Sequence, residues 1–500
     1  SVTTDSLYDT AWSPQGDAIL YASDEDHSVT TDSLYDTAWS PQGDAILYAS
    51  DEWINDYEAY GLALLGEEGD SLLNLAPELL DNSGTLINSD AQWSPDGSYV
   101  AFSADPDGNG KYKLYLADRE GNRILVNPDL VEEHIYQPTW SPDGSQIAFI
   151  SNSLEASKYE LYIYDLASGQ VEGPLNGVLV VGGDVSSFLW SPDGDHLVYR
   201  ANQDISGTQE LYLVELASGQ VSKVNGNFAA GGYVRDDYQW SSDGTKIFYR
   251  HEDLISSSVI KLYVYDLVSQ DRNIVNGTMF ADGWVWDYQL SPDGTHVAYR
   301  ADQDTHDQYE LYVVSLDDLG HSTKVNGTLS VGTNVYSTYR WSPDSNYLAY
   351  TRPGLFPVSY LEFLVVYELV GGTNQNVTLP YENDTGANRD VFTFAWSPDS
   401  SQLAYLAEIA ENGLTELFLV DPAGVGAKVS QEIDPSFESV TSIIQWSPDG
   451  SALVYFIYDA YYRANLYWPE TGETLEINSL LEQEDWSVRE LRFSPVGWGE

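Results

Sequence analysis

A short string, WSPDG, recurs along the chain and constrains its fold more than any other feature of the sequence. The first residue of the string, usually tryptophan, returns at intervals of about fifty residues between positions 39 and 493. A period of this size is typical of a chain built from stacked supersecondary units. Complete copies of the string lie at Trp93–Gly97, Trp140–Gly144, Trp190–Gly194 and Trp446–Gly450.

The unit at 136–177 shows the content of one repeat. Four short segments rich in β-branched and aromatic residues alternate with turn signals. In Ser141–Gly144, proline presets the φ angle of a type I turn, and glycine takes the left-handed position that closes a bulged hairpin. Because proline or glycine interrupts every helical period, helices are disfavoured. We therefore expect an all-β fold, a single β-propeller in which four antiparallel strands make each blade.

The repeated tryptophan ends the first strand of each unit, beside the tight turn. There its ring can bury about 200 Å² against the adjacent blade. Some repeats depart from the pattern, since Ser242 replaces the proline, Leu290 the tryptophan, and Ser345 and Ser400 the glycine. We expect looser first turns in those blades. The residues assigned to blade packing are Trp93, Trp140, Trp190, Trp240, Trp341, Trp396 and Trp446.

The pattern of WSPDG, a short apolar strand and an ELY-type strand resembles the TolB-type propeller repeat. It is similar also to the propeller of prolyl oligopeptidases, and it covers residues 39 to about 493. Those peptidases join the propeller to an α/β-hydrolase domain, but this sequence has no G-x-S-x-G nucleophile elbow. The resemblance therefore implies the propeller without the peptidase activity, and we expect no enzyme.

The repeats also predict the domain organisation. Eight complete repeats begin near residue 88, so we expect eight regular blades within 93–500, together with a C-terminal closing strand. Residues 28–92 form a first or accessory blade, either a ninth one or one completed by the C-terminal strand. Residues 1–27 form an extra half-blade of two strands, because residues 1–25 recur without change at 28–52. That identity has two explanations, an artefact of gene assembly or a recent duplication.

The N-terminal copy suggests self-assembly. Two strands without a third expose unpaired edges, which can add to the sheet of another molecule. Head-to-tail addition of this kind gives a filament or a ring. The residues expected in the assembly strands are Leu7, Tyr8, Trp12, Ile19, Leu20 and Tyr21.

Composition excludes several classes of partner. Aspartate and glutamate total 78 against 21 lysines and arginines, which gives a formal net charge of −57. Such a surface repels phosphate, so we expect no binding to nucleic acid. The absence of cysteine excludes disulfides and thiolate metal sites. Glutamates interrupt the richest apolar stretch, at 360–370, so no transmembrane segment is expected.

One sequence resembles a metal loop. Asp105, Asp107 and Asn109, followed by Gly110, match the first half of a calcium-binding loop. The twelfth position is Leu116 where a bidentate glutamate is required, so the alternative is a polar hairpin tip. Calcium is the one candidate cofactor. No catalytic residue can be singled out among so many carboxylates.

Three arginines, Arg200, Arg250 and Arg300, stand at one position of consecutive repeats. Such a row can line one face of the ring and hold an anionic ligand, but pairing with neighbouring aspartates between blades is the favoured interpretation.

Two functions follow from these features. The first is a non-enzymatic extracellular or cell-surface propeller, a structural or binding unit that binds another protein or assembles with itself into filaments. The alternative, implied by the resemblance, is a periplasmic TolB-like scaffold that binds a protein or small ligand at the propeller mouth. Catalysis by clustered carboxylates and calcium is a weaker third option, because fold alone does not exclude it.

Overall fold

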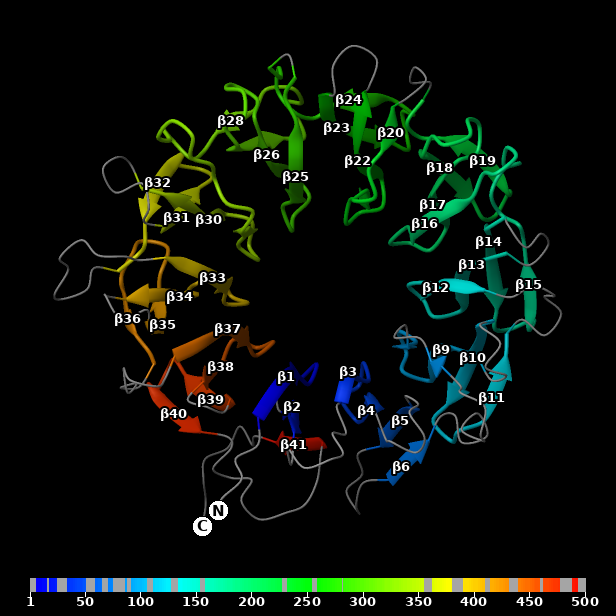
Figure 1. Ribbon diagram of the computed structural model, residues 1–500, viewed down its shortest axis with the longest axis horizontal. Coiled ribbons are helices and arrows are strands. Elements are labelled where there is room, and N and C mark those ends of the chain that lie inside the picture. Colours follow the sequence, from blue (N-terminus) through cyan, green and yellow to red (C-terminus); the bar gives the residue numbers. More distant parts are fainter. Residues whose placement is uncertain are drawn as a thin grey trace. The chain divides into compact units, whose positions relative to one another are not determined.

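A computed structural model describes most of the chain (Figure 1). The described residues are 6–15, 18–24, 34–50, 59–64, 71–74, 86–87, 91–105, 111–126, 134–152, 158–226, 232–253, 259–280, 282–354, 362–379, 390–409, 414–430, 439–458, 462–476 and 488–492. Every regular element among them is a β-strand. Apart from the first seven residues, the chain divides into two compact units, Tyr8–Asp236 with Trp486–Glu500, and Asp237–Asp485.

In the first unit the described strands form five sheets. One joins the two ends of the chain in the order β1-β2-β41, and the others follow one another along the sequence. β7 and β8 both pair with β9 and act as two pieces of one first strand. The strands are β1 (Ser6–Trp12), β2 (Ala18–Asp24) and β41 (Val488–Arg492); β3 (Leu34–Trp39), β4 (Ala45–Ser50), β5 (Ala59–Leu64) and β6 (Ser71–Asn74); β7 (Leu86–Ile87), β8 (Gln92–Trp93), β9 (Tyr99–Asp105), β10 (Lys113–Asp118) and β11 (Arg123–Leu125); β12 (Ile135–Trp140), β13 (Gln146–Ser151), β14 (Glu160–Asp165) and β15 (Gln170–Glu172); β16 (Val185–Trp190), β17 (His196–Ala201), β18 (Glu210–Glu215) and β19 (Gln220–Lys223); and the short β20 (Tyr233–Val234).

The second unit contains five four-stranded arrangements in sequence order. Their strands are β21 (Gln239–Trp240), β22 (Lys246–Asp253), β23 (Val259–Asp266) and β24 (Arg272–Ile274); β25 (Val285–Leu290), β26 (His296–Ala301), β27 (Glu310–Ser315) and β28 (Thr323–Lys324); β29 (Tyr339–Trp341), β30 (Tyr347–Pro353), β31 (Glu362–Glu368) and β32 (Thr373–Asn376); β33 (Val391–Trp396), β34 (Leu403–Ile409), β35 (Leu414–Val420) and β36 (Gly426–Lys428); and β37 (Ser439–Trp446), β38 (Leu453–Tyr458), β39 (Tyr462–Trp468) and β40 (Glu473–Glu476).

The predicted fold class is confirmed. The eight regular repeats, from the sheet of β7 and β8 to that of β37–β40, each form a path of four antiparallel strands, as in a propeller of about eight blades. Residues 28–92 contain a four-stranded sheet of their own, β3 to β6. The C-terminal β41 pairs with β2, in the register Ile19↔Leu491, and not with that sheet.

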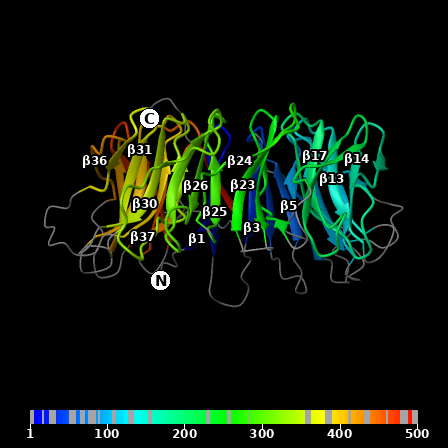
Figure 2. The same cartoon turned by 90° about the horizontal axis from the view of Figure 1, so that it is seen from above.

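The core lies between consecutive sheets. The two middle strands of a sheet are buried along most of their length, as in β14, whereas the outer strand β15 is short and exposed. In the second unit, β25, β26, β30 and β31 stand side by side (Figure 2), and a core cluster joins residues of the two sheets that contain them. A sheet packed on both sides needs apolar residues on both faces, which explains the nearly continuous apolar runs in the middle strands. One such cluster combines Ala148, Ile150, Leu161 and Ile163 with Phe188, Trp190 and Leu197 of the next sheet.

The WSPDG turn is closed by side chains as well as by the backbone. The Ser141 hydroxyl donates to Asp143 Oδ1 at 2.7 Å, and the Ser145 N–H donates to the same oxygen at 3.0 Å. The Gly144 N–H donates to the Ser141 carbonyl at 2.9 Å, with a Gly144 φ of 72°. The left-handed φ explains why glycine is the usual residue at this position.

The expectation of looser first turns is wrong for Ser345 and Ser400. Both residues take the left-handed conformation, with φ of 62° and 63°, and both keep the closing backbone hydrogen bond at 2.9 Å. Their hydroxyls accept hydrogen bonds from the N–H groups of Asp293 (3.0 Å) and Asp344 (2.9 Å) in the preceding turn. A hydrogen bond between sheets therefore compensates for the unfavourable backbone conformation.

The turn aspartates predict a pH dependence of stability. The Ser241 hydroxyl and the Thr245 N–H lower the pKa of Asp243 to about 2. Because the folded-state pKa lies below the ordinary value of 3.8, this carboxylate stabilises the fold above about pH 4, and the stabilisation is lost as the pH falls toward 2. We expect Asp243→Asn to lower the thermal unfolding midpoint at pH 7 and to match the wild type near pH 2. The control is Asp271→Asn, at an exposed carboxylate that accepts no hydrogen bond within the described residues. This variant should leave the thermal unfolding midpoint unchanged both at pH 7 and near pH 2. A constant difference between wild type and Asp243→Asn across this range would contradict the assignment.

Candidate functional site

Exposed aromatic side chains recur at one position of the repeat. In four repeats a solvent-exposed aromatic follows a buried Val or Ile. This apolar residue opens the first strand in three of them, and in the fourth it is Val335, shortly before β29. Large apolar side chains that remain exposed at equivalent places indicate a binding surface. These residues and their exposed fractions are Tyr136 (44%), Trp286 (36%), Tyr336 (38%) and Phe392 (50%).

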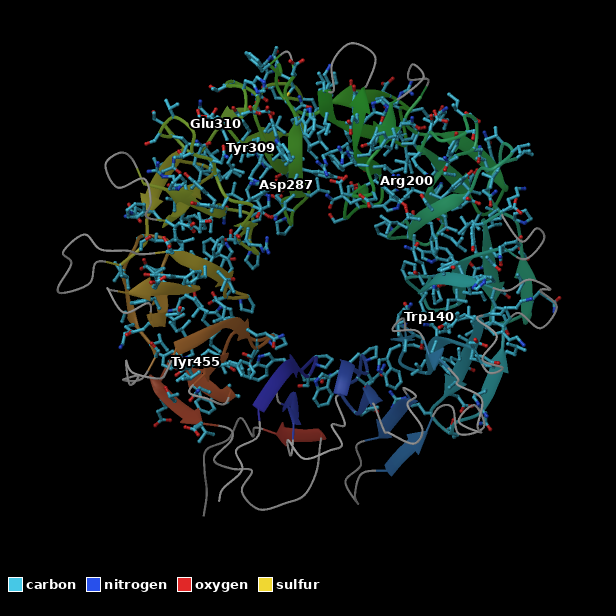
Figure 3. The ribbon with its side chains drawn as sticks, viewed as in Figure 1. Trp140, Arg200, Asp287, Tyr309, Glu310 and Tyr455 are labelled. Atoms are coloured by element: carbon cyan, nitrogen blue, oxygen red, sulfur yellow. The ribbon has the colours of Figure 1, made fainter. Side chains whose placement is uncertain are left out.

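The largest aromatic group lies on the sheet β25–β28 and is called here the aromatic cluster, formed by Trp284, Trp286 and Tyr309. The ring of Trp286 lies 5.1 Å from that of Trp284 and 4.7 Å from that of Tyr309. Tyr309 directly precedes β27 and lies beside Glu310 (Figure 3). Tyr136 and Tyr159 form the equivalent pair on the sheet β12–β15, with ring centroids 5.3 Å apart.

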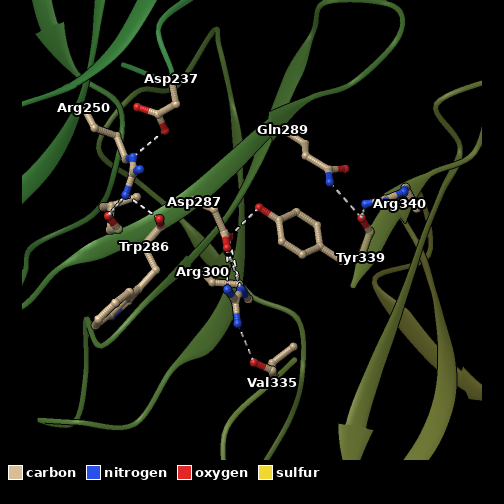
Figure 4. Close-up of polar contacts among 10 residues, drawn as sticks. Asp237, Arg250, Trp286, Asp287, Gln289, Arg300, Val335, Tyr339 and Arg340 are labelled. Atoms are coloured by element: carbon tan, nitrogen blue, oxygen red, sulfur yellow. Dashed lines mark hydrogen bonds and ion pairs between the residues drawn. The ribbon is translucent and has the colours of Figure 1, made fainter. Parts of the chain in front are cut away.

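Arg250 bonds the backbone that carries Trp286 of the aromatic cluster. Arg250 forms an ion pair with Asp237, with Nε 2.6 Å from Oδ2. Its Nη1 donates to the carbonyl of Val285 at 2.9 Å and also to that of Trp286 (Figure 4). The start of β25 is thereby fixed to the preceding sheet, which gives the Trp286 ring a rigid base.

The next repeat uses the same arrangement. Arg300 forms an ion pair with Asp287, and its Nη1 donates to the carbonyl of Val335 at 2.9 Å (Figure 4). The Tyr339 hydroxyl donates to Asp287 Oδ1 at 2.9 Å, and burial raises the pKa of Tyr339 well above its ordinary value. Tyr339 therefore remains a donor at any physiological pH.

Pairing with aspartates is thus confirmed for Arg250 and Arg300. The expected pairing between blades is wrong for Arg300, because Arg300 and Asp287 lie opposite each other in the same sheet. Arg200 makes the corresponding bond across sheets, from Nε to the carbonyl of Val234 at 2.9 Å.

The loop that precedes β27 is anchored at its base by a buried ionic network. Glu310 is only 3% exposed, and it accepts hydrogen bonds from Lys324 Nζ and from the Tyr312 hydroxyl, both at 3.1 Å. Lys324 Nζ also lies 3.0 Å from the carboxylate of Asp304, which is in the loop itself. Burial, followed by the charge of Glu310, raises the pKa of Tyr312. Asp204, Glu210, Tyr212 and Lys223 form the same network two repeats earlier.

The structure places the predicted packing tryptophans between sheets. The Trp190 indole N–H donates to the carbonyl of Thr139 at 3.1 Å, and Thr139 immediately precedes the tryptophan of the preceding repeat. Trp140 is buried in a cluster with Ala101 and Leu114 of the preceding sheet. Trp240 is partly buried at the end of β21. The bond of Trp190 recurs in Trp93 to Ala38, Trp341 to Gln289, Trp396 to Arg340 and Trp446 to Ala395.

The predicted calcium residues are only partly described. Asp105 ends β9 and is buried, whereas Asp107 and Asn109 lie outside the described residues. The calcium loop therefore stays a prediction.

The predicted assembly residues lie in the first two strands. Leu7, Tyr8 and Trp12 are in β1, and Ile19, Leu20 and Tyr21 are in β2. Because β2 pairs with β41, one of the edges expected to be free is covered by a strand of the same chain.

A second polar site in the first unit surrounds Arg119. An open pocket of about 520 Å³ there is lined by Gln42, Asp44 and Asp118 among others. Arg119 binds both oxygens of Asp44, at 2.7 and 2.9 Å, and this hydrogen bonding lowers the pKa of Asp44. The arginine also lies over the Trp93 ring, 5.5 Å from its centroid. Its charge is thus neutralised within the protein, which makes the pocket a poor anion site.

Sequence reasoning did not identify the exposed aromatics, although a signal was present. Aligned on the tryptophan marker, Tyr136, Trp286 and Phe392 each stand four residues before it. Their exposure depends on strand facing and on the neighbouring sheet, which the alignment alone does not reveal.

Comparison with known proteins agrees with this architecture. Residues 107–254 match the family model described as the TolB beta propeller domain, which confirms the resemblance for that part of the chain. Dipeptidyl-peptidase 5 of Porphyromonas gingivalis is 28% identical over 162 residues, 30% of this chain and 22% of that protein. The chain thus matches about a fifth of that relative's length.

Two solved structures of similar proteins are dipeptidyl peptidase 4 of Porphyromonas gingivalis and TolB of Acinetobacter baumannii. The first is 13% identical with a TM-score of 0.49, and the similarity covers 77% of this chain and 58% of the peptidase chain. The second is 19% identical with a TM-score of 0.28, and the similarity covers 70% of this chain and 78% of the TolB chain. Among the residues that the structure describes, no helix is long and apolar enough to cross a membrane.

The arginine bonds generate a prediction about stability. Arg300→Ala removes the ion pair to Asp287 and leaves the carbonyl of Val335 without this donor, so we expect a loss of about 2 kcal/mol in the free energy of unfolding. Arg340→Ala is the control, because Arg340 is exposed and donates to the carbonyl of its own neighbour Tyr339. Denaturant unfolding followed by tryptophan fluorescence measures both variants. Equal stabilities of the two variants would show that the bonds across sheets contribute little.

Proposed function

We propose that this protein is a non-enzymatic binding propeller that acts outside the cytoplasm and receives a protein segment on its exposed aromatic residues. The observation that carries the proposal is the aromatic cluster, in which an exposed tryptophan contacts two aromatic neighbours at tilted angles and Arg250 bonds the backbone beside it.

Rigid aromatic side chains suit protein recognition. A tryptophan or tyrosine buries about 150–250 Å² on contact and loses little conformational entropy when its orientation is already fixed. Such residues dominate the binding energy of many protein interfaces. Trp286 fits this description, because its neighbours and its backbone both restrain it.

Charge favours a basic partner. The net charge is −57, and buried or half-buried ion pairs hold Lys223, Arg250, Arg300 and Lys324. The negative electrostatic potential of the rest of the surface attracts lysine and arginine side chains of a partner. A segment with an apolar or aromatic anchor flanked by basic residues therefore fits this surface best.

A binding role without catalysis agrees with the sequence, which lacks the nucleophile elbow of the hydrolases. The similar peptidases share their propeller pattern with this chain. A location outside the cytoplasm rests on the resemblance to TolB-type proteins, which implies a periplasmic or extracellular setting.

A peptide-display selection on the full chain tests the binding role. We expect enriched peptides that combine an aromatic anchor with basic residues, and we expect Trp286→Ala to weaken their binding at least tenfold by fluorescence anisotropy. Val370→Ala removes an apolar side chain that is more exposed than Trp286, in the turn between β31 and β32, and this variant should bind as the wild type does. Equal binding by both variants would place the peptide site elsewhere.

Self-assembly is a second candidate function, favoured by the sheet that contains both ends of the chain. Because β41 pairs with β2 over a long separation in sequence, β41 of one copy can pair instead with β2 of another. Assembly would then proceed by exchange of β41 and not by addition to an empty edge.

Deletion of residues 1–27 tests this assembly. If copies exchange β41, the full chain should form oligomers at high concentration in size-exclusion chromatography and negative-stain images, and the truncated chain should not. A monomer in both cases ends the hypothesis.

A further inference from the structure

The loop between β26 and β27 brings together three side chains that can bind a metal. The ligand atoms of Asp302, His306 and Asp307 all lie within 4.8 Å of one another. His306 Nδ1 is 3.2 Å from Asp307 Oδ1. Zinc bonds of 2.0–2.1 Å in a tetrahedral site separate adjacent ligand atoms by about 3.3 Å, so this pair has the required spacing.

Asp302 is a buried carboxylate with few partners. Its side chain belongs to a residue only 4% exposed, and within the described part of the chain it accepts one hydrogen bond, from the Trp284 N–H. A carboxylate can accept about four hydrogen bonds, and a buried one is costly unless a cation or several donors compensate its charge. Arg300, the nearest arginine in sequence, forms its ion pair with Asp287 instead. A carboxylate oxygen of Asp302 therefore lies close to the ligand atoms of His306 and Asp307 without an arginine to compensate it, which suits a bound cation.

An equivalent loop of the same protein lacks this feature. Residues 201–210 and 301–310 share their length and their succession of bends and turns. In the first loop the position of Asp302 is taken by Asn202, a neutral side chain whose Oδ1 accepts a hydrogen bond from Gln209. Tyr309 replaces that glutamine in the second loop. The change to a carboxylate thus coincides with the loss of the amide donor.

The other two ligand positions differ in the same way. Ser206 and Gly207 stand where the second loop has His306 and Asp307. All three metal-binding groups are therefore present in one loop and absent from the other, although both loops have the same anchor at their base, Asp304 with Lys324 and Asp204 with Lys223. The His306 ring is further oriented by Phe280, with ring centroids 5.8 Å apart.

From these observations we propose that Asp302, His306 and Asp307 form a binding site for a divalent transition-metal ion, with Zn²⁺ as the ion their chemistry favours. One imidazole nitrogen with two carboxylate oxygens is a donor set that zinc accepts, whereas calcium prefers six to eight oxygen ligands. Three protein ligands leave a coordination position for water or for a donor atom of a bound molecule. The site lies next to the aromatic cluster, since Trp284 bonds to Asp302, but it does not depend on the binding role proposed above.

Calorimetric titration of the full, chelator-treated chain with ZnCl₂ tests the proposal. The buffer contains millimolar CaCl₂, so that calcium occupies the many surface carboxylates. We expect one zinc ion per chain at micromolar affinity or tighter. Asp302→Asn, His306→Ser and Asp307→Gly together transplant the sequence of the equivalent loop, and this triple variant should bind at least a hundredfold more weakly while its unfolding midpoint without metal stays close to that of the wild type.

The reverse transplant is the matched control. Asn202→Asp, Ser206→His and Gly207→Asp should create a second zinc site, which raises the stoichiometry to two. His306→Ser alone should lower the affinity at least tenfold, which separates loss of a ligand from loss of loop structure. Zinc binding that is unchanged in the first triple variant, or no zinc binding by the wild type, would overturn the proposal.

Discussion

The structure depends on contacts between sheets more than on contacts within them. A single four-stranded sheet has apolar side chains on both faces of its middle strands and cannot bury either face by itself. Each core cluster therefore combines residues of two consecutive sheets, as the clusters around Trp190 and Trp446 do. The tryptophan contributes twice, through its ring and through an indole N–H that bonds the carbonyl just before the preceding marker position. One residue type can make both the ring contact and the indole hydrogen bond in successive repeats only where the spacing between sheets is constant. This explains why tryptophan returns with the period of the repeat.

The same geometry carries the candidate site. Arg250 bonds the opening residue of β25, and Arg300 bonds Val335 shortly before β29, so the exposed side chain that follows each bonded valine has a fixed base. The exposed aromatics are thus continuous with the packing of the sheets, and the side chain proposed to contact a partner is one residue away from a fully buried valine such as Val285. A partner that binds there meets a preorganised surface and pays little entropy to order it.

Local features of the sequence predicted local features of the structure. The strands and the WSPDG turns follow from residue type, because Pro142 and Gly144 restrict the backbone wherever they occur. The regular turns at Ser345 and Ser400 were not predictable, since their hydroxyls bond a turn more than fifty residues away. The pairing of β41 with β2 was missed for a related reason, because residues 7–23 and 34–50 have the same sequence and local pattern cannot choose between them. Asp302, His306 and Asp307 were overlooked because their spacing matches no known metal motif. Only comparison with the equivalent loop at 201–210 shows that the three groups occur together in one loop and not in the other.

The two identical hairpins also have different third strands. The copy at 34–50 pairs with β5, which begins only a short distance further along the chain, whereas the copy at 6–24 pairs with β41, close to the C-terminus. Identical hairpins accept either neighbour, so tether length decides which partner each one obtains. In the order of synthesis the first hairpin can complete its sheet only after residues 488–492 have been made, while its twin meets its neighbour soon after its own synthesis. The sheet of β1, β2 and β41 therefore closes later than the sheet of β3 to β6, and a chain that stalls before residue 488 leaves the ribosome with the first of these sheets unfinished.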